Sequence, residues 1–249
     1  MYNPFVLSRI YNPFIFVAIT IGVYIGCLLP DTDAYHSKLD YMWGLNIGGI
    51  AWAFGKVTKI IVNPIVVATF GWIMRKPINR NHRGMVHSIS GIISYCLILE
   101  AMFLLVLWLF ETAAPGTIPV DIGKDIIWYY SCFTLGLFVG GLLHLAEDAC
   151  TVSGILPFYP FDVTTKFSGD IHTGNFEDRR PKRYFYLVCV VGISIIAILT
   201  YFRMKGLYSL RLCILAGLVG FLVSWAIIAI SAGVSYTHLK ELDKEVTYG

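Results

Sequence analysis

Four uninterrupted apolar stretches, each close to or above the length that crosses a lipid bilayer, constrain this chain more than any other feature. They occupy residues 87–110, 126–146, 184–202 and 212–235, and a shorter one runs over residues 10–29. A helix needs roughly 20 apolar residues to span the hydrocarbon core. Of the 249 residues, 57% are hydrophobic and 14% charged, as in chains solvated by lipid. The sequence predicts an all-α, polytopic membrane protein with about five transmembrane helices, forming one integral membrane domain over residues 1–249.

Residues 41–74 do not follow this pattern. Two lysines and an Asn63-Pro64 pair break the segment into two apolar pieces of about 15 residues, each short for a span. In the first piece the apolar residues recur at helical spacing, which is typical of a helix lying in the membrane interface. We therefore expect an interfacial helical segment here, with a re-entrant hairpin as the alternative.

Three short polar motifs interrupt the apolar sequence, and each abuts a long apolar run. They are LLPDTD at 28–33, HRGMVHS at 82–88 and HLAED at 144–148. Acids and histidines beside the hydrocarbon core are costly unless something pairs with them, so ionisable residues placed there indicate a functional site. Taken one at a time, the motifs could instead be a turn, interfacial anchors or a buried hydrogen-bonded pair.

The expected topology brings these motifs to one side of the membrane. With five spans and no crossing by residues 41–74, the segments 30–86 and 149–183 and the C-terminal tail share a face that carries fourteen of the nineteen lysines and arginines. The positive-inside bias makes that face cytoplasmic. A single crossing by residues 41–74 would instead place the first motif on the opposite face from the other two.

Carboxylates at these positions favour a bound cation. Asp31 and Asp33 follow one helix, and Glu147 and Asp148 end another, where the helix dipole disfavours negative charge. A divalent metal would compensate, since it binds deprotonated carboxylate and neutral imidazole. The sequence therefore predicts metal binding where these motifs meet.

Spacing suggests which side chains would act as ligands. His144 and Asp148 are four residues apart, on one helical face, and Glu147 could also reach. His82 and His87 are five apart, so we place His82 in the preceding loop and His87 in the first turn of the next helix. The candidate metal ligands are Asp31, Asp33, His82, His87, His144 and Asp148. Mixed imidazole and carboxylate ligation favours Zn²⁺, with Mn or Fe as alternatives, and allows one or two ions.

These residues suggest an ester hydrolysis. The guanidinium of Arg83 suits a phosphate or carboxylate on a substrate. A metal-activated water would attack the ester, with Glu147 or Asp31 as general base. The candidate catalytic residues are therefore Glu147, Arg83 and Asp31.

The three motifs resemble a prokaryotic inner-membrane family that includes the LexA-regulated YdjM protein and is described as metal-dependent hydrolases. Its pattern is Leu-Pro-Asp-x-Asp, His-Arg-Gly-x-Thr-His-Ser and His-x-x-x-Asp-x-x-Thr-x-x-Gly, followed by a proline-rich turn and a Gly-x-x-x-Glu-like element. The resemblance covers residues 26 to about 185 and departs from the pattern at Val86, which replaces the threonine, and at Ala34, which replaces a histidine. It implies further site residues, in the second shell or at the substrate: Ser88, Thr151, His172 and Glu177.

The resemblance implies a membrane-embedded hydrolase without naming its substrate. The His-x-x-x-Asp element is also similar to helical zinc phospholipase C sites, which favours a phosphoester, a lipid headgroup or a phosphorylated small molecule. The alternatives are a metal- or proton-coupled transporter and a non-enzymatic scaffold with a structural metal. The net charge of +3, with cations arranged as membrane flanks, gives no reason to expect nucleic-acid binding.

Overall fold

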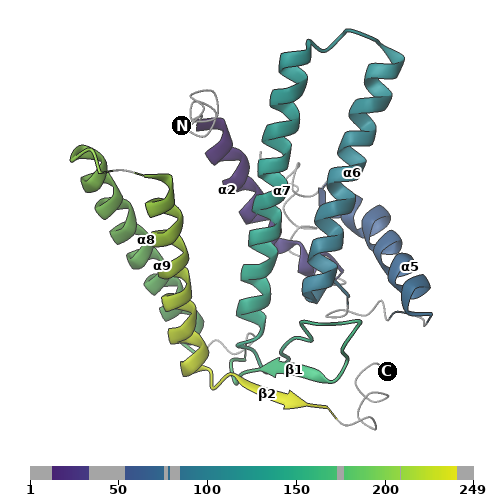
Figure 1. Ribbon diagram of the computed structural model, residues 1–249. Coiled ribbons are helices and arrows are strands. Elements are labelled where there is room, and N and C mark those ends of the chain that lie inside the picture. Colours follow the sequence, from purple (N-terminus) through teal and green to yellow (C-terminus); the bar gives the residue numbers. More distant parts are fainter. Residues whose placement is uncertain are drawn as a thin grey trace. The chain divides into compact units, whose positions relative to one another are not determined.

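The computed structural model describes residues 13–33, 54–75, 78, 85–172, 177–207 and 209–239. Within these residues the chain is mostly helical (Figure 1). The main helices are α2 (Pro13–Leu28), α5 (Asn63–Met74), α6 (Ile89–Ala113), α7 (Val120–Asp148), α8 (Arg180–Met204) and α9 (Leu210–Ser231). Two short strands, β1 (Thr165–Ser168) and β2 (Ser235–His238), form a two-stranded sheet that the sequence did not predict.

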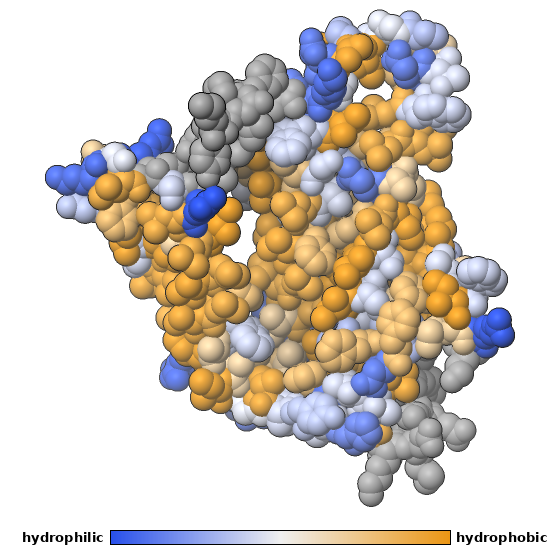
Figure 2. Space-filling model, in the orientation of Figure 1, coloured by the Kyte–Doolittle hydropathy of each residue, from blue (hydrophilic) through white to orange (hydrophobic). Residues whose placement is uncertain are grey.

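Five helices in the described residues are long and apolar enough to cross a membrane, which matches the predicted number. Four of them correspond to the predicted spans. The fifth is Phe54–Met74, whereas the first apolar segment forms only a shorter helix, Phe14–Leu28. On the face drawn in Figure 2, apolar residues cover the lengths of the helices and hydrophilic residues gather at their ends. The pattern is that of a multi-pass membrane protein.

The interruption expected at residues 56–64 does not end the helix. The chain is helical from Phe54 to Met74, and a π-helical turn, η3 (Thr58–Val62), leads directly into α5. Pro64 lacks a backbone N–H and would clash with the carbonyl four residues earlier in a regular α-helix. A wider π turn just before it relieves that conflict and keeps the helix continuous.

The described residues divide into two compact units. The first contains residues up to Leu145 together with Leu156–Thr165, and the second contains Ala146–Ile155 and Lys166–His238. In the first unit, 3₁₀ turns follow α2 and precede α6: η1 (Pro30–Asp33) and η4 (Met85–His87). These two turns contact each other, and η1 also contacts η3.

Small residues let α2 and α7 approach closely in the first unit. A Cβ at Gly136 or Gly140 of α7 would collide with backbone carbonyl oxygens of α2, and one at Gly22 or Gly26 would collide with α7. Glycines four residues apart are a common device for such contacts between membrane helices. The backbone of Gly26 therefore lies against α7 one turn before His144.

The second unit is built on the hairpin of α8 and α9. Its small buried core contains Cys150, Ile171, Ile228, Ala229 and Ala232. Arg180, at the start of α8, forms ion pairs with Asp170 at 2.5 Å and with Asp178 at 2.7 Å. Its guanidinium also donates to the carbonyl of Ser231 at the end of α9. The arginine thus connects both helices of the hairpin to the preceding loop.

Candidate metal centre

Asp31 lies in the 3₁₀ turn that follows α2. Leu29 and Pro30, immediately before it, are buried, and the Leu29 N–H donates to the carbonyl of Gly26 at 3.2 Å. This bond closes the end of α2 and turns the chain at Pro30. The side chain of Asp31 is 31% exposed. The apolar anchor at residues 29–30 thus fixes an acidic side chain at the end of a membrane helix.

His87 is completely buried in η4, just before α6 rather than within its first turn. Ser88 determines this arrangement. Its hydroxyl donates to the carbonyl of Met85 at 2.7 Å and accepts from the Gly91 N–H at 3.0 Å. The second bond is a helix N-cap, and the first closes the 3₁₀ turn. Ser88 therefore holds the backbone of His87 from both sides.

His144 lies in the last turn but one of α7, and the close α2–α7 contact sets its tautomer. Its Nδ1 lies 2.8 Å from the carbonyl oxygen of Cys27. A carbonyl only accepts hydrogen bonds, so Nδ1 carries the hydrogen and donates it. In the neutral ring, Nε2 then presents a lone pair, as it does in metal-bound histidines whose other nitrogen donates to a backbone carbonyl.

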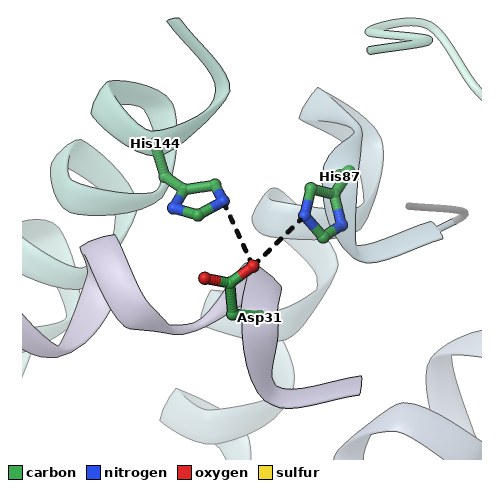
Figure 3. Close-up of side chains that lie close together, drawn as sticks. All are labelled: Asp31, His87 and His144. Atoms are coloured by element: carbon green, nitrogen blue, oxygen red, sulfur yellow. Dashed lines mark ion pairs between the residues drawn. The ribbon is translucent and has the colours of Figure 1, made fainter. Parts of the chain in front are cut away.

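One residue from each of the three polar motifs meets at a single point (Figure 3). Oδ1 of Asp31 lies 3.7 Å from Nε2 of His144 and 3.8 Å from Nε2 of His87. The two imidazole rings lie edge to face, with centroids 5.4 Å apart. Each residue offers a ligand atom within 4.8 Å of the other two. All three residues belong to the first unit.

These distances suit an ion better than a direct hydrogen bond. Nitrogen–oxygen hydrogen bonds are about 2.7–3.2 Å long, so 3.7 and 3.8 Å exceed that range. Two ligand atoms bound to one Zn²⁺ at about 2.1 Å lie at most about 4.2 Å apart. The carboxylate oxygen and either Nε2 therefore fall within reach of one small cation, and the ligand atoms of all three residues lie within 4.8 Å of one another. The arrangement could hold a divalent metal.

Three predicted residues cannot be placed at this cluster. His82 and Arg83 lie outside the described residues. The backbone of Asp33 ends η1, but its side chain also lies outside the description. Their proposed roles therefore stay predictions.

The acids at the end of α7 fall in the second unit. Asp148 is buried and Glu147 is exposed, so the two neighbours face different surroundings. The helix α7 is continuous through both residues. The hydroxyl of Thr151 donates to the Asp148 carbonyl at 2.7 Å and so closes the C-terminal turn. Ligation by Asp148 stays a prediction.

The residues that the resemblance added are distributed between the two units. Ser88 adjoins His87 in the first unit. His172 and Glu177 are exposed in the second unit and near Asp178 in sequence. The hydrogen bonds from Arg180 hold the pKa of Asp178 at about 2, well below the usual value. Arg180 thus has a structural role within the second unit.

Cys150 follows the third motif but has the character of a core residue. Its side chain is buried in the core of the second unit. Burial, with a contribution from the charge of Glu147, raises the pKa of its thiol to about 11. A thiol of this kind is protonated at neutral pH and is a poor nucleophile.

Two determinants of the site escaped sequence analysis. The spacing of Gly136 and Gly140 is typical of close helix packing, but it does not identify Gly22 and Gly26 as the partners. The carbonyl of Cys27, which sets the tautomer of His144, has no sequence signal because every residue carries a carbonyl.

A comparison with known protein families gives a match over most of the chain. The model of the family described as YdjM inner membrane protein matches residues 5–229. This match confirms the resemblance seen in the three polar motifs. No curated protein and no solved structure matches the chain.

Proposed function

The chain belongs to the YdjM inner membrane protein family, and on that premise we propose that it is a membrane-embedded, metal-dependent hydrolase of phosphoesters, with Asp31, His87 and His144 as metal ligands. Family membership supports a multi-pass protein of the inner membrane. The hydrolytic activity and the metal are our inference from the side chains. The positive-inside bias supports a site on the cytoplasmic face.

The observation that carries this proposal is the orientation of His144. Its Nδ1 is occupied by the Cys27 carbonyl, so Nε2 directs a lone pair toward the carboxylate of Asp31. Two electron-rich atoms facing each other at 3.7 Å repel unless a proton or a cation lies between them. His87 adds a third ligand atom within 4.8 Å of the others. A divalent cation would satisfy all three atoms together.

The three described ligands by themselves would leave a coordination position open, as in catalytic zinc sites. When bound, a divalent metal lowers the pKa of a coordinated water and makes it a nucleophile at neutral pH. The protein's part is to hold His87 and His144 rigidly and to exclude water from the buried side of the site. In the hydrolysis, the water oxygen bonds to phosphorus and the bond to the alcohol oxygen breaks. A carboxylate accepts the water's proton and passes it to the leaving alcohol oxygen. Glu147 and Asp31 are the predicted candidates for that base.

The substrate class follows from position and charge. The cluster lies at the ends of membrane helices, next to the level where lipid headgroups begin. A phosphate there would suit the predicted guanidinium of Arg83. We therefore expect a lipid headgroup or a phosphorylated small molecule, and Zn²⁺ as the preferred metal, with Mn and Fe as alternatives.

The test is metal analysis of the purified protein, followed by assays with phosphatase and phospholipase substrates. The proposal predicts near-stoichiometric transition metal and a turnover that chelators remove and Zn²⁺, Mn²⁺ or Fe²⁺ restores. His144→Ala should remove both the metal and the turnover. Thr112→Ala is a matched control, because Thr112 is exposed at the far end of α6 and bonds only within its own helix.

The same experiments separate the alternatives. A transporter would show metal-dependent flux in proteoliposomes without hydrolysis, and a scaffold would retain its metal with no turnover. Turnover that survives complete removal of the metal would contradict the proposal directly.

A further inference from the structure

The helix over residues 54–74 is long enough to cross a bilayer, but its contacts place its two ends at different depths. We propose that it is a re-entrant helix that enters only the leaflet beside Asp31, His87 and His144, and that its outer end joins the 156–161 loop in an apolar rim facing the lipid headgroups. The rim consists of Trp72, Ile73, Phe158 and Phe161.

The inner end of this helix lies at mid-membrane depth. The ring of Phe54 packs edge-on against Phe133 of α7, with centroids 5.8 Å apart. The next residue, Thr134, bonds to Glu100 of α6 at 2.7 Å, so Phe133 and Glu100 are at the same level. Glu100 is eleven residues beyond the start of α6, which is about 16 Å along its axis. Phe54 therefore lies near the middle of α6, a helix of 25 residues.

The outer end lies at the level where α6 begins. Phe70 packs edge-on against Phe161, with centroids 5.8 Å apart. The loop that carries Phe161 is fixed to the start of α6, because the Ile89 N–H donates to the Pro157 carbonyl at 2.9 Å and the Ser90 hydroxyl to the Tyr159 carbonyl. Between Phe54 and Phe70, the depth of the helix in the membrane thus changes by about half the membrane thickness. It accompanies the half of α6 nearest His87 (Figure 1).

The location of the three motifs agrees with this path. Asp31 and His87 are 3.8 Å apart, so the chain between them starts and ends at the same depth. If the 54–74 helix were the only membrane crossing between Asp31 and His87, these two residues would lie on opposite faces. The 54–74 helix therefore cannot be a lone span.

The exposed side chains argue against a helix that lies flat on the membrane. Large apolar residues are exposed along the whole length of the segment, among them Val57, Ile60, Ile65, Trp72 and Ile73. A helix lying in the interface would turn a polar face toward water. These side chains require hydrocarbon along the inner part of the helix.

The rim marks the depth at which the helix leaves the hydrocarbon. Trp72 is 82% exposed and Phe161 is 64% exposed, and Arg75 follows immediately as the helix cap. Aromatic residues next to a basic residue are typical of the boundary between acyl chains and headgroups. Phe158 and Phe161 of the rim belong to the loop that contacts the start of α6 at Ile89, two residues after His87. We infer that it sets the depth of the site at the headgroup layer.

Depth measurements with spin labels test this inference. Single cysteines would be placed in a cysteine-free chain at the exposed positions 57, 60, 65, 69 and 73 and labelled in nanodiscs. The depth of each label would be measured from its accessibility to oxygen and to a nickel reagent. Residues 57 and 73 are about 24 Å apart along the helix axis. If this tilted helix enters one leaflet only, depth should decrease steadily from residue 57 to residue 73 by less than that length, about 16 Å, which is the distance from the start of α6 to Glu100. Positions 93, 97, 104 and 108 of α6 form the matched control, with the greatest depth near the centre.

Two other profiles would overturn the inference. Greatest depth near residue 65, with both ends shallow, would show a true crossing. Uniformly shallow values would show a helix on the surface. If the cysteine-free chain does not fold, encoded keto amino acids at the same positions carry the label in the native sequence. None of these outcomes depends on metal binding or hydrolysis.

Discussion

Two polar clusters lie along α6 and α7, and they satisfy their carboxylates in different ways. Midway along the helices, Glu100 accepts hydrogen bonds from Ser131 at 2.8 Å and from Thr134 at 2.7 Å, one on each oxygen. At the end of the helices, Asp31 faces two imidazole nitrogens at 3.7 and 3.8 Å. The first cluster is closed by the protein's own donors. The second is spaced for an added cation.

The comparison shows that an ionisable residue in a membrane helix need not mark a reactive site. Glu100 joins α6 to α7 through the hydroxyls of Ser131 and Thr134, which compensate for its partial burial. At the Asp31 cluster, His144 of α7 and His87 of η4 each place Nε2 near the carboxylate.

The largest effect is expected from removing a ligand. His144→Ala should weaken metal binding at least a hundredfold, because it leaves two of three described ligands, and the same is expected for His87→Ala. Titration with Zn²⁺ against a competing chelator measures this change. The contact of Cys27 with His144 comes from its backbone carbonyl, so Cys27→Ser is the matched control and should bind the metal normally. Equal affinity in His144→Ala and the wild type would remove His144 from the ligand set.

The next largest effect is expected where α2 meets α7. Gly140→Leu places a side chain against the Val23 carbonyl, so the two helices must separate. We expect a loss of about 1–3 kcal/mol in the free energy of unfolding, and weaker metal binding because Cys27 moves away from His144. Gly217→Leu is the control, since a Cβ there meets nothing within 4 Å. Thermal unfolding in detergent gives the comparison, and equal destabilisation by both variants would contradict it.

A smaller effect, confined to stability, is expected at the central cluster. Glu100→Ala removes both acceptors from Ser131 and Thr134 and should cost about 1–2 kcal/mol, while Glu100→Gln, which retains one acceptor, should cost less. Metal content should be unchanged in both variants. Loss of metal from Glu100→Gln would show that the two clusters act as one.

The smallest effect is expected from the cap of α6. Ser88→Ala removes one hydrogen bond to Gly91 and one to Met85, and should cost about 1 kcal/mol of stability. Because these bonds hold the backbone of His87, metal binding should weaken by less than tenfold. Ser88→Thr retains the hydroxyl and should restore both properties, whereas an unaffected Ser88→Ala would remove the serine from the support of the site.

Much of the fold could be predicted from the sequence because bilayer thickness sets the length of an apolar helix. The spans expected at 87–110 and 184–202 correspond to α6 and α8 with shifts of a few residues. The continuous helix over 54–74 was missed because its lysines and Asn63-Pro64 pair indicate a break, and local patterns do not reveal a π turn. The strands β1 and β2 are too short to carry a clear alternation.

The sequence indicated where the candidate site lies more fully than it indicated which residues form it. The motifs led to Asp31, His87 and His144, because segments separated by an even number of membrane crossings lie on the same face. Sequence could not give the approach of α2 to α7, since glycine spacing shows that a helix can pack closely but not against which partner. The tautomer of His144 depends on that approach.

X-ray absorption spectroscopy at the edge of the bound metal tests the central claim most directly. The account predicts two imidazole nitrogens and at least one carboxylate oxygen at about 2.0–2.2 Å from a single ion. His144→Ala should lose one imidazole from the spectrum of any metal it retains. A metal surrounded only by oxygen or sulfur, or protein that takes up no transition metal under any loading condition, would contradict the account.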